Sequence, residues 1–303
     1  MKRSSNTEPI PPPTTIKMPQ TSHFASQDGC PHQLHFFSAS HAHHDTPIVL
    51  FFPAMGVRTS YYFNLAESFN QLDIHFACMD LRGNGPNHQR PSWFCNFGYQ
   101  EMLEQDWPAA IEKVKQYHPH NPIYLMGHSL GAQLSVCFAA LNPQNVEGII
   151  MVAGGTVHYT AFHHKWRTYL GTQVLSALSH IAGFLPGKLV GFGGREARQL
   201  MRDWACNARS GRYRIKQSSG YKSLDGYLTQ MKKPVLAISF DGDKYTPHSS
   251  TVKFLDKLSR ANKVHIRTSS HEMKTDTLDH FNWVKCGNTL APKILKWIAQ
   301  QGA

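Results

Sequence analysis

Short apolar runs alternate along the chain with segments whose apolar residues recur every three to four positions. Continuous runs rich in β-branched and aromatic residues are typical of parallel strands covered on both faces, and the three-to-four spacing is typical of helices that pack on such a sheet. The pattern predicts a doubly wound, mostly parallel α/β sheet. We expect strands near 33–39, 48–52, 74–79, 123–127, 146–153, 234–240 and 264–267, and helices from about 61 and near 103–114, 130–141, 252–258 and 291–299.

Two segments depart from this alternation. Residues 1–28 are rich in Pro, Ser, Thr and Gln, which predicts a flexible leader. Residues 156–233 interrupt the core with helical patterns near 166–185 and 195–205. The Gly-Phe-Gly-Gly run at 191–194 lacks the Gly-Lys-Ser/Thr ending of a phosphate loop, so we expect a hinge. The predicted organisation is a core of 29–155 and 234–303 with a basic helical cap of 156–233.

The excess positive charge is concentrated in this predicted cap. The net charge is +11, and residues 156–233 contain thirteen Lys or Arg against three acids. Basic side chains interleaved with aromatic ones would suit an anionic acyl substrate or an acidic membrane surface, although the charge could equally serve solubility. The sequence has no nucleic-acid recognition motif, so we expect no nucleic-acid partner.

Cysteines, histidines and the N-terminal residues bear on cofactors and location. The six cysteines are scattered without metal-ligand spacing, and the histidines at 41, 43 and 44 have no second cluster to complete a site. We therefore expect no metal, cofactor or disulfide framework. No apolar signal segment follows Met1 and no run is long enough to span a membrane, which predicts a cytoplasmic protein. The oligomeric state is left open.

The centre of the candidate chemistry is Gly127-His128-Ser129-Leu130-Gly131. It follows an apolar run and precedes a helical pattern, which is the context of a nucleophile elbow, where a sharp strand-to-helix turn exposes a serine hydroxyl. The two glycines are expected because side chains there would crowd the neighbouring backbone.

A serine nucleophile needs a base and an acid that orients it, and in this kind of fold they follow in the order Ser, acid, His. Asp243 lies in the loop after the 234–240 strand and is the preferred acid, with Asp241 as the alternative. Two histidines follow the last predicted strand, His271 and His280, and position alone does not separate them.

The tetrahedral intermediate needs backbone N–H groups directed at its oxyanion. One is expected from Leu130, directly after the nucleophile. The second is expected from the turn after the 48–52 strand, where Met55 is best placed.

Several motifs together resemble the α/β-hydrolase superfamily, and in particular a bacterial branch of predicted serine hydrolases similar to serine aminopeptidases and monoacylglycerol lipases. The matching residues are the Pro-Ala-Met-Gly-Val turn at 53–57, the Tyr-Tyr pair at 61–62, Asp-x-Arg-Gly-x-Gly at 80–85, the elbow, and Asp-Lys-Tyr-Thr-Pro at 243–247. The branch ends its last long loop in Gly-His-Phe/Met-Gly-Phe, which implies that His280 is the base. This chain has Asp279 and Asn282 at the glycine positions, which could stiffen or reshape that loop.

The expected function is hydrolysis of a carboxylic ester or thioester through an acyl-enzyme on Ser129, with His280 and Asp243 completing the triad. An anionic or lipid-like substrate, and peripheral contact with an acidic membrane surface, are the partners that the cap suggests. The same residues would serve an acyltransferase, an amidase or a peptidase, and a non-catalytic binding protein on this fold is the alternative from another class.

Overall fold

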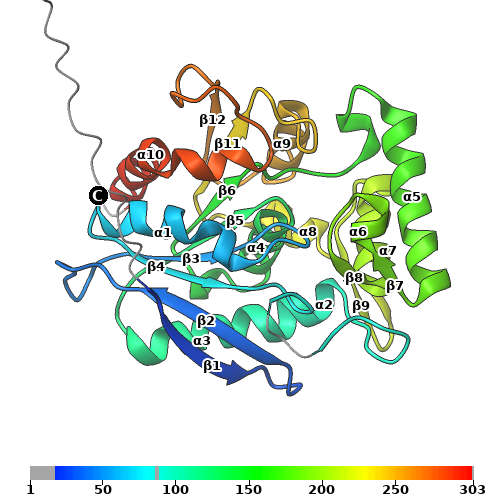
Figure 1. The fold of residues 1–303 in the computed structure, drawn as a ribbon, viewed down its shortest axis with the longest axis horizontal. Helices are drawn as coiled ribbons and strands as arrows, with labels where there is room; N and C mark the ends of the chain where they lie inside the picture. The colour runs from blue at the N-terminus through cyan, green and yellow to red at the C-terminus, as the bar shows by residue number, and fades with distance from the viewer. Residues whose placement is uncertain (1–17, 86–88, 302–303) are drawn as a thin grey trace, which may run out of the picture.

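The computed structural model describes residues 18–85 and 89–301. They form an eight-stranded sheet in the order β1-β2-β4-β3-β5-β6-β11-β12 (Figure 1). Strands β3 to β12 of this sheet pair in parallel, whereas β2 pairs antiparallel with both β1 and β4. The strands are β1 (Gln20–Ala25), β2 (Pro31–Phe37), β3 (Ile48–Phe52), β4 (His75–Met79), β5 (Ile123–His128), β6 (Gly148–Val152), β11 (Val235–Phe240) and β12 (Lys263–Thr268).

Helices cover both faces of this sheet. The apolar core divides into two clusters, one with α3, α4 and α9 and the other with α1 and α10. Every residue of β3, β4, β5, β6 and β11 is buried, as a parallel sheet between two helical layers requires. The helices are α1 (Phe63–Asn70), the short α2 (Tyr99–Glu101), which leads through a π-helical turn into α3 (Trp107–Tyr117), α4 (Leu130–Leu141), α9 (His248–Leu255) and α10 (Gly287–Ala299).

The predicted α/β sheet and all seven predicted strands are present, with ends displaced by up to a few residues. The predicted leader is wrong in its second part, because Gln20–Ala25 form β1 and pair along their whole length with β2. Polar residues on β1 hid this strand, since it lies at the sheet edge and is largely exposed. Residues 1–17, the first part of that prediction, lie outside the described residues.

Most of the segment between β6 and β11 forms a layer at one side of the molecule, whereas its last helix, α8, lies beside α4 (Figure 1). Its two long helices, α5 and α7, match the predicted helical patterns, but its two small antiparallel hairpins had no clear sequence pattern. Its elements are α5 (Lys165–Ala182), β7 (Phe184–Pro186), α6 (Gly187–Val190), β8 (Arg195–Ala197), α7 (Arg198–Ser210), β9 (Arg214–Gln217), β10 (Gly220–Ser223) and α8 (Asp225–Gln230). We refer to residues 156–233 as the cap.

None of the helices in the described ranges combines the length and the apolar character that crossing a bilayer would require. The cytoplasmic location stays a prediction from the sequence.

Candidate active site

Ser129 lies at the end of β5 and immediately before α4, in a strained backbone conformation with φ 54° and ψ −113°. A non-glycine residue persists there only where its surroundings hold it, which is typical of functional turns. A Cβ on Gly127 would lie 2.3 Å from the Ala132 nitrogen, and one on Gly131 would lie 2.2 Å from the Phe52 carbonyl oxygen. The expected role of both glycines in this sharp turn is confirmed.

Asp243 and His280 are in direct contact. The Nδ1 atom of His280 lies 2.8 Å from Oδ2 of Asp243, and both side chains are buried. The other carboxylate oxygen of Asp243 accepts the backbone N–H groups of Tyr245 and Thr246, each at 2.8 Å. The acid is therefore held on both oxygens, and its contact leaves Nε2 of the imidazole available to a substrate or nucleophile.

The alternative acid and base lie elsewhere. The exposed Asp241 forms an ion pair with Arg267 on the neighbouring strand β12. His271 is exposed in the loop after β12, where its carbonyl accepts the N–H of Lys274. The structure brings together Asp243 and His280, and it pairs Asp241 with the neighbouring strand instead.

The residues that replace glycine near His280 bind one another. Asp279 Oδ1 accepts the backbone N–H groups of Phe281 and Asn282, and its Oδ2 accepts the side-chain amide of Asn282 at 2.8 Å. Gly242, in the loop after β11, lies against the loop that contains His280: a Cβ on Gly242 would lie 2.0 Å from the Leu278 carbonyl oxygen. The loop that contains His280 is thus held by its own side chains and packs tightly against the loop that contains Asp243.

Met55 and Leu130 lie where oxyanion donors were expected. Both residues line the same pocket as Ser129 and His280. Leu130 is the first residue of α4, so its N–H has no partner within the helix. Among the hydrogen bonds of the described residues, the N–H groups of Met55 and Leu130 donate none, and no bond joins Ser129 Oγ to His280. Such contacts often tighten only when substrate is bound.

A buried link between Tyr62 and His128 was not foreseen from the sequence. The Tyr62 hydroxyl lies 2.7 Å from Nδ1 of His128 and accepts the N–H of Ala54, beside Met55. Burial first, and then the charge on His280, hold the pKa of His128 well below its usual range, so it stays neutral and can accept the hydroxyl proton. Its ring lies 4.7 Å from that of His280. The link joins the oxyanion turn, the elbow and the base; the Tyr61-Tyr62 pair was the available signal.

The pocket over Ser129 is mainly apolar and has a volume of about 310 Å³. The core supplies its polar floor, and the cap supplies much of its wall. The cap residues that line it are Val157, Phe162, Thr168, Thr172, Gly191, Phe192, Gly193 and Trp204. The volume is at the small end of the range of ligand pockets.

None of the thirteen basic residues of the cap is among the residues that line this pocket in the described chain. Lys244, from the loop that also contains Asp243, is the lysine in the lining, and no arginine is present in it. The cap charge therefore lies outside this pocket.

The glycine run at 191–194, predicted as a hinge, forms part of the pocket wall. A Cβ on Gly56, next to Met55, would lie 2.3 Å from the Gly194 nitrogen, so cap and oxyanion turn meet backbone to backbone. The Gly194 N–H donates to the buried Glu196 at 2.8 Å. The lack of side chains here allows this close approach.

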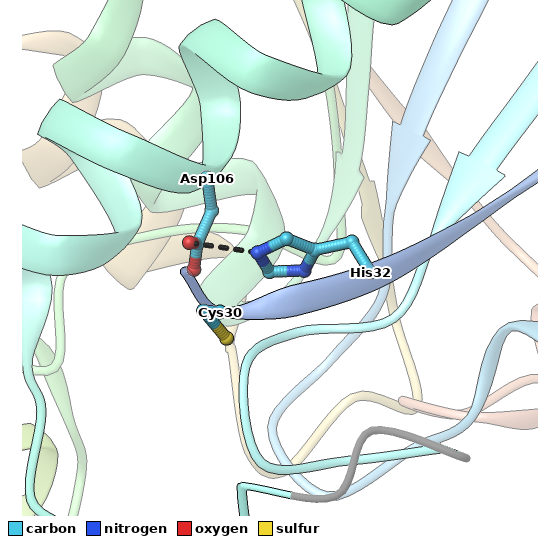
Figure 2. Close-up of side chains that lie close together, drawn as sticks. All are labelled: Cys30, His32 and Asp106. Atoms are coloured by element: carbon cyan, nitrogen blue, oxygen red, sulfur yellow. Dashed lines mark ion pairs between the residues drawn. The ribbon is translucent and has the colours of Figure 1, made fainter. Parts of the chain in front are cut away.

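A second cluster of titratable groups lies away from the pocket, at Cys30, His32 and Asp106 (Figure 2). Their candidate ligand atoms lie within 4.8 Å of one another, so by residue type they could hold a metal ion. However, the Arg82 guanidinium donates to both oxygens of Asp106, and His32 Nε2 lies 3.1 Å from the same carboxylate. A metal ion there would have to displace one cation and lie beside the other, so the donor set fits an ion-pair network better.

This network predicts a loss of stability at alkaline pH. Burial opposes the charge on His32, but contact with Asp106 and Cys30 outweighs it and raises the pKa from 6.5 to about 9. Because the folded state holds this proton more tightly, the stabilisation is complete below pH 6.5 and lost as pH rises through 9. We expect the free energy of unfolding to fall by up to about 3 kcal/mol over this range.

Urea unfolding of the wild type and of His32→Gln at a series of pH values measures this effect. The difference between the two curves should shrink as the pH rises. Parallel curves would show that His32 does not titrate in the folded protein with a raised pKa.

About a third of the chain is similar in sequence to monoglyceride lipases. Rat monoglyceride lipase is 26% identical over 110 residues, which are 36% of this chain and 35% of the relative. The monoglyceride lipase homolog of monkeypox virus is 28% identical over 98 residues, 32% of this chain and 34% of the relative. The chain thus matches about a third of the length of these curated relatives.

Solved structures with the same fold cover nearly all of the chain. A soluble variant of the monoglyceride lipase of Saccharomyces cerevisiae, in complex with a substrate analog, has a TM-score of 0.70 at 14% identity and covers 97% of this chain and 98% of its own. Est1E from Butyrivibrio proteoclasticus has a TM-score of 0.59 at 13% identity, over 93% and 98%. These similarities show the α/β-hydrolase fold.

A family model described as serine aminopeptidase, S33, matches residues 43–277. This range is well over half of the chain and includes Ser129 and Asp243; His280 lies just beyond it. The chain belongs to the serine aminopeptidase (S33) family of α/β hydrolases.

Proposed function

We propose that this protein is a serine hydrolase that cleaves a carboxylic ester or thioester through an acyl-enzyme intermediate. The observation that carries the proposal is that Ser129, His280, Met55 and Leu130 line one pocket, while Asp243 contacts His280 from behind it.

The proposed reaction begins when Ser129 Oγ attacks the carbonyl carbon and His280 Nε2 takes the hydroxyl proton. Asp243 accepts the Nδ1–H, so it keeps the imidazole in the required tautomer and stabilises the imidazolium. The N–H groups of Met55 and Leu130 bind the oxyanion. The bond to the leaving oxygen or sulfur then breaks, and His280 returns the proton to it.

Deacylation repeats these steps with water. His280 takes a proton from the water as it attacks the acyl carbonyl, and the proton returns to Ser129 Oγ as the acid leaves. Tyr62 and His128 act as positioning residues, since they hold the oxyanion turn and the elbow in register without reaching the reacting atoms.

For the substrate, the proposal is a lipid-like ester with an uncharged acyl chain. Phe162, Phe192 and Trp204 of the cap and Phe281 of the core line the pocket, and such side chains suit a hydrocarbon chain. The matched relatives include two that are named monoglyceride lipase, which supports a lipid ester. Because the arginines of the cap are absent from this lining, we favour an acyl group without a charge of its own.

The test is a profile of purified protein against esters, thioesters and amides of graded acyl length, with and without a terminal carboxylate. We expect kcat/KM to rise with acyl length up to a limit and esters to exceed the matching amides. A terminal carboxylate should lower kcat/KM by about tenfold or more, because the apolar wall desolvates it. Fastest turnover of the carboxylate series, with an advantage that salt removes, would instead favour an anionic substrate.

A variant with a larger pocket tests whether the acyl chain occupies this pocket. Trp204 lines the wall and packs against Phe192, with ring centroids 5.1 Å apart. In Trp204→Ala the optimum should move to longer chains. An unchanged optimum would place the acyl chain elsewhere.

A further inference from the structure

The outward face of α5 carries an unusual set of exposed apolar side chains. Trp166, Leu170 and Val174 are 69%, 59% and 55% exposed, and Ile181 is 75% exposed. Their spacing of four and seven residues, with Leu178 between, places them on one side of the helix. Figure 1 places α5 at the outer edge of the cap, with α7 and the small hairpins between it and the core.

The opposite face of the same helix looks toward the active site. Thr168 and Thr172 line the pocket, and Ser179 is buried. A surface helix normally buries its apolar face and exposes its polar one. In α5 Leu175 packs against the core, but five other large apolar residues face outward, so the helix presents them to something other than its own core.

The exposed apolar surface continues beyond the end of α5. Trp93 packs against the C-terminal end of the helix, because a Cβ on Gly183 would lie 2.8 Å from its ring. Arg198 holds this loop, with its guanidinium 5.5 Å from the Trp93 ring centre and a hydrogen bond to the Trp93 carbonyl. Trp93 and Phe94 are exposed. We call Trp93, Phe94, Trp166, Leu170, Val174, Leu178 and Ile181 the docking face.

Basic residues border this face at its two ends. Lys165 and Arg167 flank Trp166, and Arg198 holds the Trp93 loop. Two of the three acids of the cap, Glu196 and Asp203, are buried, and burial raises the pKa of each to about 7. They therefore place no carboxylate on the surface of the cap. Apolar and aromatic side chains bordered by Lys and Arg are typical of helices that lie in the interface of a bilayer.

We propose that the docking face binds the surface of a bilayer that contains anionic lipids and so places the pocket beside it. The charge selects this occupant: a second copy of the chain, paired face to face, would bring two strongly basic caps together, whereas an anionic surface complements them. The inference deepens the proposed function, because docking would bring the pocket to lipid esters in the bilayer. It rests on that function only for the purpose of docking; the binding itself does not require catalysis.

Co-sedimentation with vesicles tests the proposal. The protein is Ser129→Ala, so that turnover does not alter the vesicles, and the vesicles contain either phosphatidylcholine alone or an equal mixture with phosphatidylglycerol. We expect binding to the mixed vesicles to be about tenfold or more tighter, with a difference that diminishes as salt rises. In the same background Leu170→Glu with Ile181→Glu should weaken binding by about tenfold or more.

A matched pair of substitutions separates this face from net charge. Tyr117 and Val264 are also exposed, but they lie on α3 and on the edge strand β12, outside the cap. Tyr117→Glu with Val264→Glu changes the net charge equally and should leave binding almost unchanged. Equal losses in both variants would overturn the assignment of the face.

Two further results would contradict the proposal. Equal binding to both vesicle types would remove the role of charge. Self-association of the wild type in sedimentation, abolished by Leu170→Glu with Ile181→Glu, would assign the face to a second copy instead. Hydrolysis of a short water-soluble ester by the Leu170→Glu, Ile181→Glu protein with intact Ser129 should remain, and its measurement distinguishes failure of docking from failure of the proposed chemistry.

Discussion

Ser129→Ala should lower kcat/KM for the best ester by at least about 10⁴-fold, because the substitution removes the atom that forms the acyl-enzyme. The residual rate would come from the oxyanion donors and substrate binding, which the substitution leaves in place. The measurement is steady-state kinetics with an ester identified by the substrate profile.

The stability of this variant provides the control. The hydroxyl of Ser129 makes no hydrogen bond within the described residues, so its loss should change the unfolding midpoint little. A folded Ser129→Ala protein that retained activity within about tenfold of the wild type would exclude Ser129 as the nucleophile.

The second large effect concerns the acid and the base. Asp243→Asn should lower kcat by about 10³- to 10⁴-fold, because an amide favours the wrong tautomer of His280. His280→Ala should reduce it at least as much, since it removes the base itself. The double variant with both His280→Ala and Asp243→Asn should lose little more kcat than His280→Ala alone, because the two residues act as one unit.

Each substitution has a matched control nearby in the sequence: Asp241 lies two residues before Asp243, and His271 lies nine residues before His280. Asp241→Asn removes an exposed ion pair with Arg267 and should change kcat by less than about threefold. His271→Ala alters an exposed loop residue and should have a similarly small effect. A large loss in Asp241→Asn or His271→Ala, with activity kept in Asp243→Asn or His280→Ala, would reverse the assignment.

The sheet and most helices were predictable because buried parallel strands are continuously apolar and their helices keep a clear period. The edge strand β1 was not predictable, since it is largely exposed and its sequence is mostly polar. The hairpins of the cap were not predicted for a related reason. Strands of three or four residues contain too little pattern to stand out from a loop.

At the site, sequence order led to Ser129 and favoured Asp243 over Asp241, and the family resemblance favoured His280; in the structure Asp243 and His280 are in contact. Asp241 and Asp243 are separated by a single glycine and face different partners. The Tyr62 link was missed because a hydrogen bond between residues far apart in the chain has no local pattern, although the Tyr61-Tyr62 pair marked the position.

Net charge was similarly ambiguous in the sequence. Composition placed the positive charge in the cap, yet could not say whether it faced the pocket or the outside. The structure resolves this point for the described residues, because cap arginines and lysines are absent from the lining of the pocket.

The central claim is that Ser129 becomes covalently acylated while His280 and Asp243 activate it. Treatment of the wild type with a fluorophosphonate, followed by peptide mass spectrometry, tests it most directly. The account predicts a single adduct on the peptide that contains Ser129, absent in Ser129→Ala and formed at least about 10³-fold more slowly in His280→Ala. A folded wild type that forms no adduct, or that carries it on another residue, would contradict the account.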